Sequence, residues 1–318
     1  MAIPTSPVAP APAPTMRQRR GTGGRRRRHR DSGEAEISGV DAQDTARSRF
    51  LRHVILCGVA LVMMYPLLWM LSSSVKPDAN IFTEQGLWPS EWRFENYTEG
   101  WNSLQHPFGH YLVNSAIVVS LSIVGTVVSS ALAAYAFARL EFPGRKLFFG
   151  LALVTLMLPG HVLLIPQYII FSELGWLNTY LPLVVPNFLA SNAFFIFLMV
   201  QFMRALPREL DDAARIDGCG PFRIFFQIIA PLCIPAFATT AIFTFISTWN
   251  EFFSPLIYIT NPDLYTVPLA LRQFMDAEGQ SSWGPMFAMS VVSLLPIVAF
   301  FIMGQRYLVK GIATTGLK

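Results

Sequence analysis

The stretch Pro207-Arg-Glu-Leu-Asp-Asp-Ala-Ala-Arg-Ile-Asp-Gly218 is a polar segment that stands between two long apolar runs. Pro207 suits the first position of a helix. The acidic group that follows, Glu209, Asp211 and Asp212, complements the positive end of a helix dipole. Gly218 suits the position just past a helix end. The stretch therefore predicts a short, charged helix that ends at the glycine.

Beyond Gly218 a second helix is predicted, because apolar residues recur at the spacing of one helix face. These residues are Phe222, Phe225, Phe226 and Ile229. In the first helix, Leu210, Ala213 and Ala214 share a face, and the small alanines leave it smooth enough for another surface to approach closely. Residues 204–231 are thus expected to form a helix, a break and a second helix, exposed between the apolar runs.

The composition places the chain among membrane proteins. Hydrophobic residues make up 53% of it and charged residues only 14%, and the mean hydropathy is +0.42. A membrane-spanning helix needs about 20 mostly apolar residues. Candidate spans cover residues 54–72, 111–135, 147–170, 181–202, 234–259 and 286–303. Pro159, Pro166 and Pro296 interrupt the third and the sixth. The sequence predicts an all-α membrane protein with six transmembrane helices.

Basic residues set the predicted orientation, because loops rich in Lys and Arg stay in the cytoplasm. They collect before the first span, after the second, between the fourth and fifth, and after the sixth. These clusters include Arg25 to Arg28, Arg139, Arg145, Arg208, Arg215, Arg223, Arg306 and Lys310. The alternate loops carry few basic residues. Both termini and the loop 204–231 are therefore predicted to be cytoplasmic in a multi-pass protein of the cell membrane.

Residues 1–50 differ in composition from the rest, being rich first in Ala and Pro and then in Arg and Gly. They lack the apolar content that would offset the entropy of ordering, so a disordered, basic cytoplasmic tail is expected. Its arginine run favours contact with membrane lipid over nucleic-acid binding, which is not expected. Residues 51–318 are predicted to form the six-span transmembrane domain.

The sequence carries no set of residues that predicts catalysis. It has no Gly-x4-Gly-Lys-Ser/Thr phosphate-binding loop, and no His, Cys and carboxylate group at metal-ligand spacing. Cys57, Cys219 and Cys233 are too few and too scattered for a disulfide framework or a metal site. We therefore expect no catalytic residues, no metal and no cofactor on this chain.

One spacing resembles a known signature. Asp212-Ala-Ala214, three residues, Gly218, nine residues, and then Ile228-Ile-Ala-Pro231 resemble the EAA loop of the permease subunits of ABC importers, with Asp212 and Ala230 in place of the usual Glu and Leu. The stretches from Trp249 to Pro255, from Tyr265 to Pro268 and from Gln305 to Gly311 also resemble the carbohydrate-uptake branch of that family, in particular the smaller permease of maltose-type systems. The resemblance covers roughly Leu51 to the C-terminus.

This resemblance implies a type I importer permease that moves a sugar or oligosaccharide, with glycerol phosphate as an alternative cargo. It implies a second homologous permease, a dimer of ATPase subunits that holds the ATP and Mg, and an extracytoplasmic solute-binding protein. The residues expected to couple to the ATPase are Glu209, Asp212, Ala213, Ala214, Asp217, Gly218 and Phe222. ATP hydrolysis is then expected on a separate subunit.

Asn250 and Glu251 are a polar pair within an apolar run, and an ionisable group there usually faces a bundle interior or a water-filled cavity. Pro255 offers no N–H to the carbonyl of Glu251, so the helix is expected to be distorted at this point. We assign both residues to the translocation path; the alternative is that Glu251 is interfacial or paired with a partner. His161 is a weaker candidate for the path. Other polar residues near the spans are expected to bond neighbouring helices; these are Asn114, Gln167, Asn187 and Asn192.

Three other functions remain possible at this point. A self-sufficient secondary transporter would show internal repeats and more intramembrane carboxylates, and neither is evident. A membrane scaffold would use the loop 204–231 to bind a partner without transport. A membrane enzyme is the weakest alternative, because no catalytic set is found.

Overall fold

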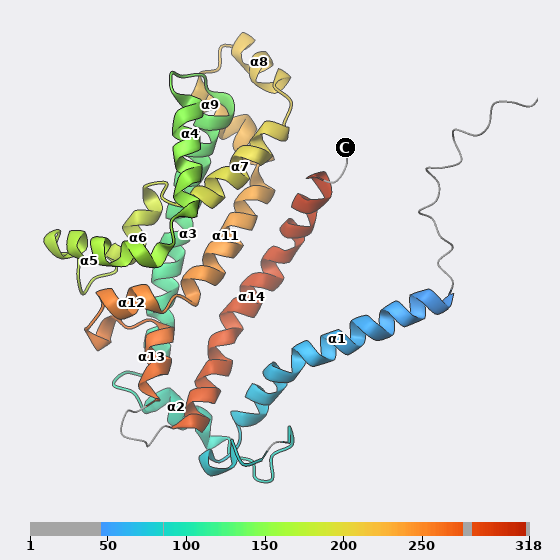
Figure 1. Ribbon diagram of the computed structural model, residues 1–318, viewed down its shortest axis with the longest axis vertical. Coiled ribbons are helices and arrows are strands. Elements are labelled where there is room, and N and C mark those ends of the chain that lie inside the picture. Colours follow the sequence, from blue (N-terminus) through green and yellow to red (C-terminus); the bar gives the residue numbers. More distant parts are fainter. Residues whose placement is uncertain (1–45, 85, 276–281, 316–318) are drawn as a thin grey trace, which may run out of the picture. The chain divides into compact units, whose positions relative to one another are not determined.

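The computed structural model describes residues 46–84, 86–275 and 282–315, and every regular element in these ranges is a helix (Figure 1). The predicted all-α class is thus confirmed, whereas most of the predicted tail lies outside the described residues. The contacts divide the chain at Met63, inside α1 (Ala46–Ser73). The bundle described below is formed by residues from Met63 onward.

Four helical segments in the described residues are long and apolar enough to cross a membrane: Ser48–Ser73, Phe108–Arg139, Leu181–Ala205 and Trp283–Arg306. They correspond to the first, second, fourth and sixth predicted spans. The second is α3 (Phe108–Arg139), the fourth comprises α6 (Leu181–Phe188) and α7 (Ala193–Ala205), and the last lies in α14 (Trp283–Thr315). Pro296 lies inside α14 without ending it.

The fifth predicted span is bent and shorter than expected. Pro221–Leu232 and Ile234–Trp249 qualify as a span only together, with a bend of 74° between them. Within it, α11 (Ile234–Trp249) ends before Asn250, and α12 (Phe253–Tyr258) follows as a separate helix. The expected distortion beside Glu251 and Pro255 is therefore present as a complete break.

The third predicted span, 147–170, is wrong as a continuous helix. The chain forms α4 (Arg145–Val154), the 3-10 turns η2 (Thr155–Met157) and η3 (Gly160–Leu163), and α5 (Leu164–Glu173). Pro159 lacks the N–H that would continue the α-helical ladder, and Leu158 bonds back only three residues, to the carbonyl of Thr155. As a result, α5 runs across the direction of α4 (Figure 1).

The long helix α3 is the centre of the bundle, because it contacts α6, α7 and α11. Small residues on α3 permit close packing: Ala131, Ala134 and Ala138 lie in the same buried cluster as Met199 and Met203 of α7. One close approach is at Gly125, where an added Cβ would lie 2.7 Å from Cδ2 of Phe188 on α6. The sequence of α3 thus sets how near its neighbours can come.

The two ends of the bundle carry different short elements (Figure 1). α8 (Glu209–Ile216) and α9 (Pro221–Ile224) lie at one end, and α2 (Glu95–Asn102) and α13 (Val267–Gln273) lie at the other. The remaining elements are η1 (Asp78–Asn80), η4 (Phe225–Ile229), α10 (Ala230–Leu232) and η5 (Pro262–Leu264).

Candidate functional site

The charged stretch between the apolar runs forms α8, but the helix begins at Glu209 rather than at Pro207. The carbonyl of Pro207 accepts a hydrogen bond from Nη1 of Arg139 at 3.4 Å, while the first turn of α8 bonds to the carbonyl of Arg208. Leu206 before the proline is extended, as the steric demand of proline requires. The predicted acidic first turn, formed by Glu209, Asp211 and Asp212, is confirmed.

Gly218 ends this helix as predicted. Its φ of 78° lies in the left-handed region, which a residue with a Cβ adopts only with strain. Around it, the N–H of Gly218 donates to the carbonyl of Arg215 at 3.0 Å, and the N–H of Cys219 donates to the carbonyl of Ala214 at 2.9 Å. This pair of bonds is the Schellman motif, and it fixes the angle between α8 and the helix that follows.

A buried ion pair attaches α8 to the bundle. Nη1 of Arg139, at the end of α3, lies 2.5 Å from Oδ2 of Asp211, and the two side chains are only 3% and 8% exposed. Nη2 of the same guanidinium donates to the carbonyls of Met203 and Leu206 at the end of α7. The arginine therefore joins α3, the end of α7 and α8.

The outward face of α8 is partly apolar. Leu210 is 37% exposed and Ile216 is 87% exposed, and Ala213 is also exposed. Ala214 differs from the predicted arrangement: it is 5% exposed and packs in the core cluster beneath α8. The face available to another molecule thus includes Leu210 and Ala213 but not Ala214.

The second helix of the loop is irregular. It consists of α9, the π-helical turn η4 and α10, in place of the single amphipathic helix predicted. Because a π turn holds more residues than an α turn, positions spaced for one α-helical face move apart. Phe225 and Ile229 are buried, whereas Phe222 and Phe226 are 74% and 63% exposed. Two phenylalanines of this segment are therefore exposed.

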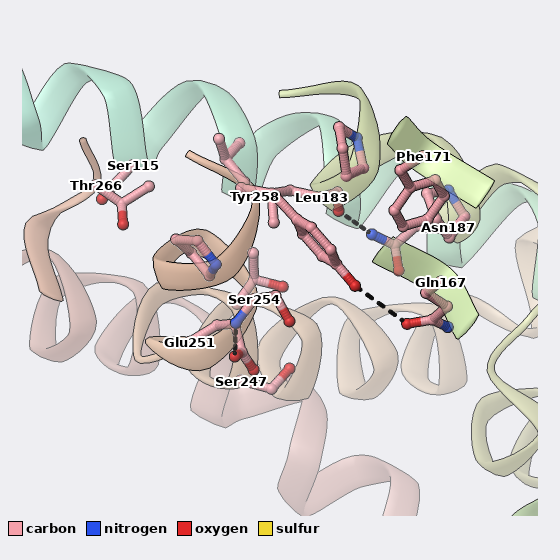
Figure 2. A pocket seen from close by; sticks show the side chains of 15 residues that line it. Ser115, Gln167, Phe171, Leu183, Asn187, Ser247, Glu251, Ser254, Tyr258 and Thr266 are labelled. Atoms are coloured by element: carbon pink, nitrogen blue, oxygen red, sulfur yellow. Dashed lines mark hydrogen bonds between the residues drawn. The ribbon is translucent and has the colours of Figure 1, made fainter. Parts of the chain in front are cut away.

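A second feature is a polar cavity of about 220 Å³ among α3, α5, α6, α11 and α12 (Figure 2). Fifteen described residues line it, most with polar side chains. Each of the five helices contributes at least one polar residue, and Glu251 adds a carboxylate. Representative lining residues are Ser115, Gln167, Asn187, Ser247, Glu251 and Tyr258. The hydroxyl of Tyr258 points across the cavity and donates to Oε1 of Gln167 at 3.4 Å.

Glu251, one of the predicted path residues, lies in the wall of this cavity at the break between α11 and α12. Its Oε1 accepts a hydrogen bond from the N–H of Ser254 at 3.0 Å. Asn250 is not among the lining residues, and its Nδ2 donates to the carbonyl of Ile246 at 2.8 Å. His161 lies in η3, and its side chain is outside the part of the chain that the structure describes.

The remaining polar residues of the spans bond mainly to protein. Nδ2 of Asn187 on α6 donates to Oγ of Ser122 on α3 at 3.1 Å, as predicted for a helix-to-helix bond. Nδ2 of Asn114 donates to the carbonyls of Asp263 and Tyr265. Asn192 precedes α7 and makes no capping hydrogen bond with its side chain. Of this group, Gln167 and Asn187 also line the cavity.

Four residues that matter for these sites have no recognisable signal in the sequence. Arg139 was assigned only to charge orientation, and Asp211 only to the helix dipole, because 72 residues separate the two and no local pattern links them. Thr266 and Tyr258 likewise gave no signal as cavity residues, since the cavity is completed by helices that lie far from them in the sequence.

A helical membrane bundle with a charged helix-turn-helix at one end and a polar cavity between its helices defines a membrane transport component. The chain belongs to the family of binding-protein-dependent transport system inner membrane components, whose model matches residues 125–314. It is a multi-pass membrane permease of the ABC importer class.

Individual relatives agree with this family. The chain is 40% identical to a probable ABC transporter permease protein, YurM, of Bacillus subtilis, over 81% of this chain and 85% of the relative. It is 32% identical to the diacetylchitobiose uptake system permease protein NgcG of Streptomyces coelicolor, over 83% and 87%. A solved bacterial ABC transporter that imports the acidic polysaccharide alginate contains a chain of the same fold, with a TM-score of 0.71, 22% identity, and coverage of 81% and 95%.

Proposed function

We propose that this chain is one permease subunit of an ATP-driven importer of a saccharide, and that α8 is the surface to which the ATPase docks. The observation that carries the proposal is the construction of α8: it presents Leu210, Ala213 and Ile216 outward, while a buried ion pair fixes it from beneath. An exposed apolar surface on a charged helix is typical of a protein-binding site.

The attachment supports a mechanical role for the helix. A partner that moves α8 would also move α3 through Arg139 and Asp211. Separating the two buried charges costs more free energy than moving the two helices together as a rigid body. Oη of Tyr135, also on α3, donates to the carbonyl of Pro221 at 3.0 Å, so the same helix holds the start of α9. ATP hydrolysis in the partner would thereby tilt the central helix of the bundle.

The coupling surface comprises Glu209, Asp212, Ala213, Asp217, Gly218 and Phe222, with Ala214 supporting it from the inside. It faces the cytoplasm in the proposed orientation. The complex also includes a second homologous permease, a pair of ATPase subunits that bind ATP and Mg, and an extracytoplasmic solute-binding protein. This chain itself carries out no hydrolysis.

The substrate is proposed to be a sugar or oligosaccharide, which the relative named for diacetylchitobiose supports. The cavity around Glu251 is proposed to lie on the translocation path, together with Asn250 and His161. A secondary transporter is disfavoured, since Glu251 is the one carboxylate among the described residues that line the cavity.

The test is to tag the chain, extract it gently from its native membrane and identify the polypeptides that accompany it. Ala213→Arg places a bulky charge on the outward face of α8, and Thr98→Arg places the same charge on an exposed position of α2 at the opposite end. We expect an ATPase with a phosphate-binding loop to accompany the wild type and Thr98→Arg, and to be lost with Ala213→Arg. Recovery of the wild-type chain without an ATPase would contradict the proposal.

A further inference from the structure

The cavity beside Glu251 has an uneven distribution of charge. Among the fifteen described residues that line it there is one carboxylate and no lysine, arginine or histidine. The other polar groups are neutral amides and hydroxyls, such as those of Gln167, Asn187, Ser247 and Tyr258. A site of this composition can offer many hydrogen bonds, but only to a ligand that tolerates a nearby negative charge.

One wall holds a hydroxyl that has no hydrogen-bond partner among the described residues. Thr266 is 5% exposed, and its Oγ1 is buried without a hydrogen-bond partner among the described residues. It lies beside Ser115 at one end of the cavity (Figure 2). A buried hydroxyl without a partner is costly, and a rotation of the Thr266 side chain toward the cavity would let a ligand hydroxyl supply the missing bond.

The carboxylate is held in place and retains a free acceptor. Oε1 of Glu251 is occupied by the N–H of Ser254, which fixes the side chain at the start of α12, whereas Oε2 has no partner in the described part of the chain. Tyr258 and Phe171 meet edge to face at 5.3 Å in the same wall, and they give the cavity a rigid apolar side.

We propose that this cavity binds one unit of a neutral, polyhydroxylated solute within this chain, and that Glu251 excludes anionic solutes such as phosphate esters and uronates. Ligand hydroxyls donate to Oε2 of Glu251 and bond to the side-chain amides of Gln167 and Asn187, which are partly exposed. An anion in the same place would meet the carboxylate at short range without a compensating cation. The inference rests on the proposed transport function for its biological meaning, but binding in the cavity does not require ATP.

The first test measures the electrostatic effect of Glu251 in the chain within its native membrane complex. Ser247→Cys places a thiol in the cavity wall, in a background that lacks Cys57 and Cys219; Cys233 is fully buried and stays in place. Two methanethiosulfonate reagents of similar size, one cationic and one anionic, are compared. Because Coulomb energies at this range are large, replacing Glu251 by Gln should lower the ratio of cationic to anionic labelling rates by about tenfold or more.

Matched controls separate this effect from unfolding. The Gln side chain keeps an oxygen that can accept from the N–H of Ser254, so the start of α12 is retained in Glu251→Gln. Ser103→Cys, exposed at the end of α2, should show a rate ratio that does not change with Glu251→Gln. An unchanged ratio at Ser247→Cys, or no labelling there at all, would overturn the proposal.

The second test uses protection by defined probes. Labelling of Ser247→Cys by a neutral reagent is measured with maltose, N,N′-diacetylchitobiose, sn-glycerol 3-phosphate or an alginate disaccharide present. We expect a several-fold slowing with at least one of the two neutral sugars and none with the two anions. Protection by either anion as strong as that by the sugars, or protection by neither sugar, would overturn the assignment.

These outcomes are independent of the ATPase assay. A cavity that discriminates charge in a chain that recovers no ATPase would leave the binding site standing and remove the motor-driven function. Recovery of the ATPase together with a cavity that does not discriminate charge would support the motor-driven function and contradict the binding site.

Discussion

Arg139 and Asp211 lie 72 residues apart in the sequence and form a buried ion pair, in which 2.5 Å separates Nη1 from Oδ2. One belongs to the last turn of the central helix α3 and the other to the first turn of α8. The pair attaches α8 to the bundle, together with Ala214, which packs in the core cluster beneath the helix. Any partner that moves α8 therefore acts on α3.

Removing one member of this pair should destabilise the protein strongly. Arg139→Met leaves the carboxylate of Asp211 buried without a cation, and such a loss costs about 3–5 kcal/mol. Thermal unfolding of the detergent-solubilised chain, followed by the loss of monodisperse protein, should show a clear fall in Tm. The double variant Arg139→Met, Asp211→Leu should recover much of that fall, since it removes both charges. A single variant as stable as the wild type would show that the pair contributes little.

The turn after α8 should depend on glycine at one position only. Gly218→Ala forces a Cβ into the left-handed region, at a cost of about 1–2 kcal/mol, and should raise the hydrogen-exchange rate of α8 amides. Gly220 has a φ of −74° and open space around it, so Gly220→Ala should leave the exchange rate unchanged. Equal effects of the two substitutions would contradict a left-handed conformation that is confined to Gly218.

The contact between α3 and α6 should be sensitive to one methyl group. Gly125→Ala would place a Cβ 2.7 Å from Cδ2 of Phe188, and overpacking of this kind costs about 1–3 kcal/mol. Gly150→Ala on α4 is the matched control, because nothing lies within 4 Å of an added Cβ there. We expect the Tm of Gly125→Ala to fall and that of Gly150→Ala to equal the wild-type value. Phe188→Leu should rescue Gly125→Ala; failure to do so would place the clash elsewhere.

The loop before α13 should contribute to stability in a pH-dependent way. Nε2 of His106 lies 2.7 Å from Oδ1 of Asp263, and this hydrogen bond holds the pKa of Asp263 below its ordinary value of 3.8. A carboxyl with a lowered pKa stabilises the folded state above its ordinary pKa, and the contribution is lost as the pH falls through the lowered value.

Asp263→Asn should therefore lower Tm at neutral pH, and the difference from the wild type should shrink once the pH falls below 3.8. Tm measured across this range for both proteins provides the check. A difference that stays constant with pH would show that the carboxylate charge is not involved.

Local features of the fold could be predicted from the sequence. The end of α8 at Gly218 and the break beside Glu251 follow from single residues, a glycine that permits positive φ and a proline that lacks an N–H. The prediction of a continuous third span, residues 147–170, was wrong for a related reason. Its apolar composition predicts one helix, but Pro159 and Gly160 divide it into α4 and α5, and composition does not show where a broken helix then runs.

The candidate sites were predictable only in part. Glu251 was identified because a carboxylate is unusual in an apolar run, and the structure places it in the cavity wall. Its companions come from α3, α5, α6, α11 and α12, and only the packed bundle brings the first three of these helices to it. Phe222, Phe225, Phe226 and Ile229 were expected to share one helix face, but Phe225 and Ile229 are buried whereas Phe222 and Phe226 are exposed.

The most direct measurement places a photo-crosslinking benzoylphenylalanine at Ile216, which is 87% exposed on α8, in the chain within its native membrane. Asn102, exposed on α2 at the other end of the bundle, receives the same group as a control. We predict that Ile216 forms an adduct with a polypeptide that carries an ATP-binding phosphate loop, and that Asn102 does not. Adducts from Ile216 that contain only lipid, or a protein without that loop, would contradict the role of α8 as the docking surface of an ATPase.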